Sequence, residues 1–150
     1  MAAEWWFYHL MQPPLAAALA PLFEKCLERD WRVLVVSTHE ETLASVDQEL
    51  WTWREDSFLP HGRDGELAER QPVLLSREAE NRNKASVLVL LNGYDHAPVA
   101  PFERVMVVFD DGDMDARGQA RRQFKAARDA GQAVRYFKQT ASGGWQENRG

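Results

Sequence analysis

The sequence contains a single cysteine, Cys26, among 150 residues. One cysteine excludes an internal disulfide and any zinc site built from several thiolates. Cys26 falls within an apolar helical pattern, so we expect it to be a small core residue. The chain also has no apolar run near the roughly 20 residues that span a bilayer. Its start, MAAEWWFYHL, has no basic region of the kind that opens a secretory signal. We therefore predict a cytoplasmic protein without membrane contact.

The chain has fewer basic than acidic residues, with 18 Lys and Arg against 23 Asp and Glu and a net charge of −5. This balance argues against non-specific binding of duplex DNA or an anionic membrane by the chain as a whole. The sequence has no G-x-x-x-x-G-K-[ST], no G-x-G-x-x-G and no G-x-S-x-G motif. The four histidines, which we predict to be surface or loop residues, lack metal-ligand spacing: His9, His39, His61 and His96. We expect neither a cofactor nor a metal.

What the chain does contain is an alternation of buried strands and amphipathic helices. Apolar runs predict strands over 5–10, 31–38, 72–76, 86–92, 104–110 and 133–139, and helical periodicity predicts helices over 15–30, 39–53 and 114–130. Pro21 is expected to kink the first helix or to move its start. The alternation predicts a three-layer α/β fold, with a mostly parallel sheet, mixed pairing allowed, and helices on both faces. It is Rossmann-like but without a phosphate-binding loop. Residues 1–140 form the predicted domain, and 141–150 a tail that is loose apart from Trp145.

Four aspartates follow the strand predicted over 104–110: Asp110, Asp111, Asp113 and Asp115. Ligand sites in open α/β sheets lie at the carboxyl ends of strands, where carboxylates can hold Mg²⁺. The alternative is that Asp113 and Asp115 cap the following helix and favour its dipole. We favour capping, because neither a phosphate-binding loop nor a second catalytic group accompanies the cluster. We therefore expect no catalytic residues.

The helix predicted over 114–130 carries a row of positive charge. Arg117, Arg121, Lys125 and Arg128 follow one another at helical spacing, about a quarter turn from an apolar row that includes Phe124. Residues 114–128 contain five basic residues and one acid, whereas the rest of the chain contains 13 basic and 22 acidic residues. A charged helix face is usually only solvated. This concentration in an acidic protein favours instead the rim of an apolar pocket for an anionic partner.

A second notable segment is LWTWREDSFLPH, residues 50–61. Leu50 and Trp53 continue the apolar stripe of the helix predicted over 39–53, so we expect them in the core. Trp51 falls off that stripe, and Phe58 and Pro60 follow the end of the helix. A core does not require these residues, and they are candidates for contact with a partner.

Three segments, WRVLVV, LWTWREDSFLPH and the late ARRQFKAAR, together resemble the chi subunit family of bacterial DNA polymerase III. The resemblance extends from the first predicted strand to the last, and its most specific part is L-W followed by S-F-x-P-H. The segment GRDGELAERQPV after His61 and the final GGWQENRG depart from the family pattern.

The resemblance implies a non-catalytic accessory subunit of the clamp-loader assembly. Such a subunit binds the acidic C-terminal tail of single-stranded DNA-binding protein (SSB), which ends in a phenylalanine carboxylate, and is joined to the polymerase by the psi subunit or an equivalent clamp-loader component. The residues matched to this tail-binding role are Trp51, Phe58, Pro60, His61, Arg117, Arg121, Phe124, Lys125 and Arg128.

These observations lead to one hypothesis and two alternatives. We expect Trp51, Phe58, Pro60 and Phe124 to wall one pocket for the terminal Phe ring, with Arg121 pairing with its carboxylate. No specific DNA contact is expected. The first alternative is a Mg²⁺-dependent phosphate or nucleotide enzyme that uses the 110–115 cluster. The second is a direct single-stranded DNA binder that uses the basic helix and exposed tryptophans.

Overall fold

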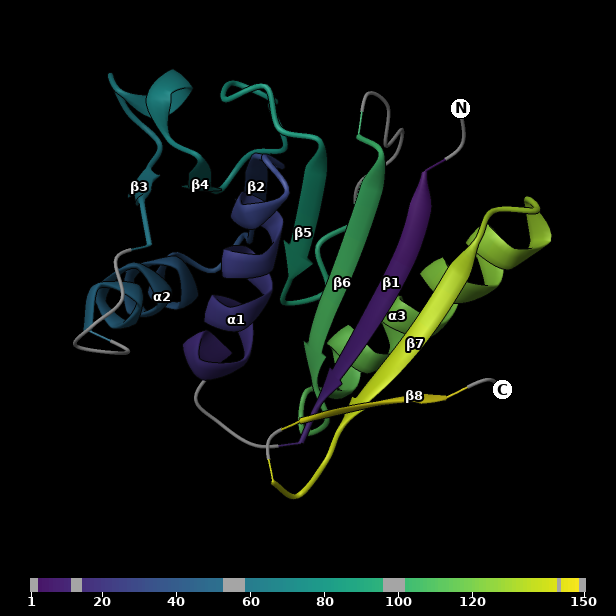
Figure 1. The fold of residues 1–150 in the computed structure, drawn as a ribbon. Coiled ribbons are helices and arrows are strands. Elements are labelled where there is room, and N and C mark those ends of the chain that lie inside the picture. Colours follow the sequence, from purple (N-terminus) through teal and green to yellow (C-terminus); the bar gives the residue numbers. More distant parts are fainter. Residues whose placement is uncertain (1–2, 12–14, 53–58, 96–101, 143, 149–150) are drawn as a thin grey trace.

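The structure is a computed structural model that describes residues 3–11, 15–52, 59–95, 102–142 and 144–148. One eight-stranded sheet in the order β3-β4-β2-β5-β6-β1-β7-β8 runs through the molecule (Figure 1). The strands are β1 Glu4–Leu10, β2 Val33–Val36, β3 His61–Arg63, β4 Val73–Ser76, β5 Val87–Leu91, β6 Arg104–Asp110, β7 Val134–Gln139 and β8 Trp145–Asn148. The helices are α1 Leu15–Glu28, α2 Glu40–Thr52 and α3 Met114–Asp129, with a 3-10 turn at Ala68–Arg70.

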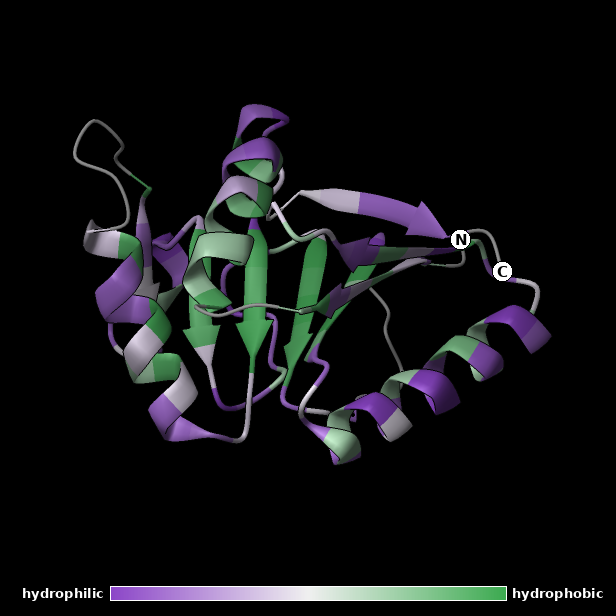
Figure 2. Cartoon of the chain, turned by 90° about the horizontal axis from the view of Figure 1, so that it is seen from below, coloured by the Kyte–Doolittle hydropathy of each residue, from purple (hydrophilic) through white to green (hydrophobic). Residues whose placement is uncertain are grey.

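Every strand pair from β3 to β7 is parallel, and β8 is antiparallel to β7. The strands β2, β4 and β5 are buried along their whole length, as expected of parallel strands covered on both faces. In Figure 2 these central strands are hydrophobic, whereas α2 and α3 contain many hydrophilic residues. The predicted three-layer α/β fold with a mostly parallel sheet is confirmed.

The sheet separates two hydrophobic cores. One core contains Leu19 and Phe23 of α1 with Leu43 and Leu50 of α2. The other contains Ala116, Ala120 and Ala127 of α3, packed against strand residues such as Phe7. The helices α1 and α2 therefore cover one face of the sheet, and α3 covers the other.

Two strands lie where the sequence predicts none. The strand β3 adds to the edge of the sheet by pairing with β4 inside the predicted loop. The strand β8 pairs with β7, and Trp145 packs edge-on against Tyr8 at 5.1 Å between ring centroids. The prediction of a loose tail over 141–150 is therefore wrong for residues 145–148, because an exposed sheet edge offers backbone groups that even a short polar segment can satisfy.

Three further predictions can also be compared with the structure. Cys26 is buried, as predicted, and its burial raises the pKa of the thiol to about 11. The helix α1 continues through Pro21, which neither ends it nor moves its start. In the described part of the chain, no helix has the length and apolarity to cross a bilayer.

The surface prediction for the histidines is wrong for two of them. His9 and His61 are buried, whereas His39 is exposed and His96 lies outside the described residues. Each buried imidazole has polar partners on both ring nitrogens. His61 contacts the backbone oxygens of Leu59 (2.8 Å) and Asp47 (3.0 Å). Polar partners are typical of buried histidine side chains.

Candidate functional site

The aspartate cluster after β6 forms the start of α3. Asp113 is the N-cap residue, and its carboxylate accepts the backbone N–H of Ala116 at 3.0 Å. The Asp110 carboxylate accepts the N–H of Gly112 at 3.0 Å and so holds the preceding turn. Within the described ranges, no group of three His, Cys, Asp or Glu side chains is placed to hold a metal ion. The capping interpretation is confirmed for Asp113.

The helix α3 presents two distinct sides. Ala116, Ala120 and Ala127 are buried against the sheet, together with Gln123, whose amide donates to the backbone oxygen of Tyr94 at 3.2 Å. The basic row runs beside this buried side. Its members Arg121, Lys125 and Arg128 are exposed, and Arg117 is half-buried. The helical periodicity thus correctly predicts cations at the border of the buried face.

Phe124 is the aromatic residue among these cations. Its half-buried ring stands edge-on against Phe7, 5.2 Å away between centroids, and against Tyr136 at 6.3 Å. The Arg128 guanidinium lies over the same ring at 6.0 Å. Phe124, Tyr136 and the basic row therefore form a surface with an aromatic floor and a cationic border, which we call the α3 site.

A partly buried row of hydrogen-bonded side chains supports the α3 site from the sheet. The Tyr136 hydroxyl lies 2.6 Å from Nδ1 of His9, and Nε2 of His9 lies 2.7 Å from the Asp111 carboxylate. Arg117 in turn donates to the backbone oxygen of Asp111 at 3.3 Å. Sequence reasoning missed His9 and Tyr136. Their signal is strand alternation, since each shares a strand face with apolar residues that pack toward α3.

The charges of the α3 site change the pKa values of the hydrogen-bonded side chains beneath it. Burial raises the pKa of Tyr136, and the positive charges of Arg117 and Arg121 oppose that rise. The hydrogen bond from His9 lowers the pKa of Asp111, with a further contribution from Arg117. Arg117 is therefore partly neutralised by an ionised carboxylate. Arg121, by contrast, forms no hydrogen bond or ion pair with any residue that the structure describes, so its guanidinium is available to an incoming anion.

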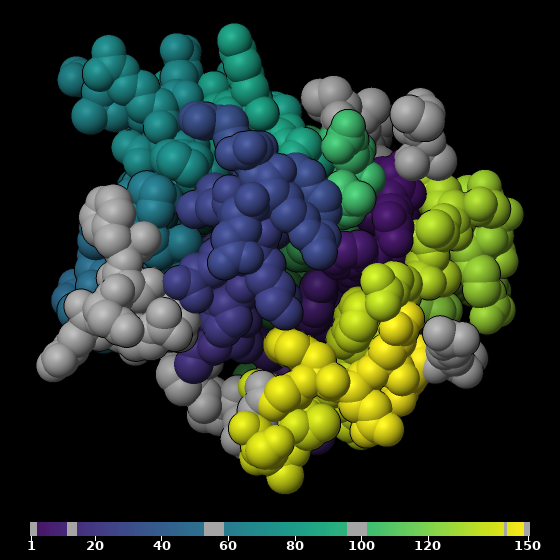
Figure 3. Space-filling view, viewed as in Figure 1, coloured from purple at the N-terminus to yellow at the C-terminus, as the bar shows by residue number. Residues whose placement is uncertain are grey.

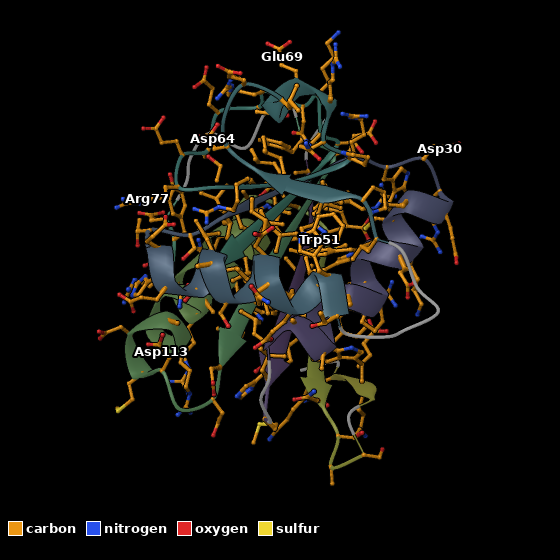
Figure 4. All side chains as sticks on the ribbon, turned by 90° about the vertical axis from the view of Figure 1, so that its left-hand side faces the viewer. Asp30, Trp51, Asp64, Glu69, Arg77 and Asp113 are labelled. Carbon is orange, nitrogen blue, oxygen red and sulfur yellow. The ribbon has the colours of Figure 1, made fainter. Side chains whose placement is uncertain are left out.

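The aromatic segment of the predicted pocket lies elsewhere. Trp51 is at the end of α2, is 51% exposed, and contacts the ring of His61 at 4.2 Å between centroids. Pro60 is half-buried, and Phe58 is outside the described residues. Figure 4 shows Trp51 on α2, away from Asp113 at the start of α3.

The sheet lies between these two groups of residues, since α2 and α3 pack on its opposite faces. The structure therefore does not bring Trp51 and Phe124 together, and the expectation that they wall one pocket is wrong. The peptide-binding roles of the individual residues stay predictions.

A cavity of about 390 Å³ lies at the carboxyl edge of the sheet and is lined by residues of α1, α2 and α3. This is where related α/β folds bind nucleotides. Here the lining includes Glu41, Glu49, Asp110 and Asp113. Four carboxylates disfavour a phosphate ligand through charge repulsion, which agrees with the missing phosphate-binding motifs.

Comparison with known proteins shows which family this chain resembles. The family described as DNA polymerase III chi subunit, HolC, matches residues 2–135. A similar protein is the probable DNA polymerase III subunit chi of Rickettsia prowazekii (strain Madrid E), which is 30% identical over 104 residues. The aligned region covers 68% of this chain and 62% of that relative, so the chain matches somewhat less than two thirds of the relative's length.

Proposed function

This chain belongs to the DNA polymerase III chi subunit family, and we propose that it is a non-catalytic, cytoplasmic accessory subunit of the clamp-loader assembly. In this proposal the α3 site binds the acidic C-terminal tail of SSB. A second surface joins the chain to the psi subunit or an equivalent component. The replicative machinery is thereby linked to SSB-coated single strands.

The arrangement around Phe124 is the observation that carries the tail-binding proposal. A tail that ends in a phenylalanine carboxylate needs an apolar contact for the ring and a cation for the carboxylate. Phe124 and Tyr136 provide aromatic surface. Arg121, which has no polar partner among the described residues, lies one helical turn from Phe124. Lys125 and Arg128 are exposed, and in this proposal they attract the aspartates that precede the terminal residue of the tail.

The energies of these contacts predict weak binding. Removing one Phe ring from water contributes roughly 1.5–3 kcal/mol, and a charge-assisted hydrogen bond contributes roughly 1.5–3 kcal/mol. Ordering the tail costs part of this sum. The two contacts together correspond to dissociation constants between roughly tens of micromolar and several millimolar. Attraction between the basic row and the aspartates of the tail adds affinity that should decrease with added salt.

Titration with SSB tail peptides by calorimetry tests the proposal. We expect removal of the terminal Phe to reduce affinity by at least about tenfold, because the loss of roughly 1.5–3 kcal/mol of burial corresponds to that factor. An amidated peptide that keeps the Phe should also bind more weakly, since it lacks the carboxylate. If both modified peptides bound like the intact tail, only general charge attraction would remain and the proposed site would be incorrect.

The second surface is marked by one exposed aromatic side chain, Trp51, on the other face of the sheet. Within the described residues, the exposed large apolar side chains are Met11, Trp51, Leu67 and Met114. Trp51 is the aromatic residue among them, and its ring contacts the imidazole of His61, which itself contacts backbone oxygens. A rigid exposed aromatic residue is typical of the centre of a protein interface. We therefore propose that the surface around Trp51 and Pro60 contacts psi, a role that replaces the tail-binding role predicted for these two residues.

Replacing Trp51 with alanine should remove most binding to the psi subunit and leave tail-peptide affinity unchanged. Truncation of an aromatic residue at an interface centre costs at least about 2 kcal/mol, or roughly thirtyfold in affinity. Surface plasmon resonance with immobilised psi measures this loss. The matched control is Met114→Ala, which removes a side chain that is 80% exposed on α3. Equal affinity of Trp51→Ala and the unaltered protein for psi would contradict the assignment.

A further inference from the structure

A third surface, on the α1 face of the sheet, is used by neither proposed contact. The helix α1 leaves the outer strands β6, β1, β7 and β8 partly uncovered, and atoms of β1 are visible in Figure 3 between α1 and the yellow strands. A groove of about 290 Å³ opens there. Its aromatic lining consists of Trp6, Tyr8, Trp31, Phe137 and Trp145.

Arginines and aromatic rings alternate along this groove. Arg104 lies over the rings of Trp31 (3.9 Å to the centroid) and Trp6 (5.7 Å). Arg135 lies over Trp6 (5.4 Å) and Phe137 (5.0 Å). A continuous row of side chains thus crosses the sheet from the end of α1 to β7, in the order Trp31, Arg104, Trp6, Arg135 and Phe137.

The charges at the groove are predominantly positive. Glu147 accepts two hydrogen bonds from Arg135, at 2.8 and 3.0 Å, and Glu4 accepts the indole N–H of Trp6 at 2.8 Å. Lys25 and Arg29 border the groove and form no ion pair within the described residues. Arg104 lies 4.0 Å from the exposed Glu103, and its Nε is buried without a hydrogen-bond partner in the part of the chain described. This part of an acidic protein therefore attracts anions.

We propose that this groove binds a short segment of single-stranded nucleic acid. Ring faces and guanidinium planes stack with bases of any sequence, and flanking cations attract the phosphates. An acidic peptide with one terminal aromatic residue would require a single ring-sized pocket beside a cation. The groove instead offers several ring faces in a row, with cations between and beside them. This arrangement matches a nucleic-acid strand, in which aromatic bases and anionic phosphates repeat.

The position of the groove makes this contact compatible with the proposed tail binding. Trp6, Arg104 and Arg135 project to the α1 face of the sheet, whereas Tyr136 and Phe124 belong to the α3 face. An SSB tail on α3 and a nucleic-acid segment in the groove would therefore lie on opposite faces. The inference goes beyond the proposed function and does not depend on it.

The experiment is a fluorescence-anisotropy titration of a labelled oligothymidylate of about twenty nucleotides, repeated at several salt concentrations with the full chain. Lys25→Gln/Arg29→Gln is the test variant, because both side chains are exposed and their loss should not affect folding. We expect about fivefold or greater weakening at low salt. The slope of log affinity against log salt should decrease by about 1.4, since each phosphate contact on a single strand contributes about 0.7.

Two matched variants carry the same change in charge elsewhere. Arg70→Gln/Arg77→Gln replaces exposed cations that do not line the groove, and Arg121→Gln/Lys125→Gln replaces cations of α3. Both should bind the oligonucleotide like the unaltered protein. The proposal is overturned by absence of oligonucleotide binding at low salt, by an unchanged affinity and slope in Lys25→Gln/Arg29→Gln, or by an equal loss in either matched variant. Displacement of the oligonucleotide by the SSB tail peptide would also overturn the proposal, because it would show that the groove binds a peptide.

Discussion

Replacing Arg121 with alanine is expected to remove most binding of the SSB tail peptide while leaving the free energy of unfolding almost unchanged. The side chain is exposed and has no hydrogen-bond or ion-pair partner among the described residues. Its removal should therefore cost the folded state little. The peptide, however, would lose its charge-assisted hydrogen bond, worth roughly 1.5–3 kcal/mol. That loss corresponds to roughly ten- to hundredfold weaker binding, which calorimetric titration can measure.

The control for this substitution is the adjacent arginine. Arg122 is also exposed on α3, but it bonds to Gln119 through two contacts of 3.1 and 2.7 Å and lies off the basic row. Arg122→Ala changes the net charge by the same amount and should weaken binding only slightly. Equal loss in the two variants would show that net charge alone attracts the tail. Unchanged affinity in Arg121→Ala would show that the carboxylate pairs with a different residue.

Much of the fold can be predicted from the sequence, because its central strands are continuous apolar runs. Residues 33–36 and 87–91 are recognisable as strands covered on both faces, since nearly every side chain in them is β-branched or Leu. The edge strands β3 and β8 are not recognisable, because their sequences HGR and WQEN contain little apolar alternation. Such strands are stabilised by pairing with a neighbouring strand that is distant in sequence or follows a turn. The local sequence pattern does not predict this pairing.

The candidate site also has one part that can be predicted from the sequence and one part that cannot. The basic row depends on helical periodicity alone, so Arg117, Arg121 and Arg128 can be identified from spacing. The chain of hydrogen bonds through His9 joins strands that are more than one hundred residues apart, and no local pattern indicates it.

The expectation of one pocket failed because it required knowledge of the strand order. In the observed order, the connections through α1 and α2 run toward β3, whereas the connection through α3 runs toward β8. Right-handed crossovers in opposite directions place their helices on opposite faces of the sheet. Trp51 on α2 and Phe124 on α3 are therefore separated by the topology.

The packing beneath Phe124 gives the prediction with the largest effect on stability. Phe7 is fully buried, stacks with Trp5 at 6.0 Å and supports the ring of Phe124 edge-on at 5.2 Å. Phe7→Ala would leave a ring-sized cavity between the sheet and α3. We expect a loss of about 3–5 kcal/mol in the free energy of unfolding, measured by urea denaturation. This is a large part of the roughly 5–15 kcal/mol typical of a folded domain.

A double-mutant cycle separates the contact between the two rings from the cavity. Phe124 is half-buried, so Phe124→Ala should cost less than Phe7→Ala. In Phe7→Ala/Phe124→Ala the losses should fall short of additivity by about 0.5–1.5 kcal/mol, the coupling expected of an edge-to-face aromatic pair. Strict additivity would show that Phe7 does not hold Phe124. If the coupling is present, Phe7→Ala should also weaken tail-peptide binding in its folded fraction, because the aromatic floor beside Arg121 would have lost its support from the core.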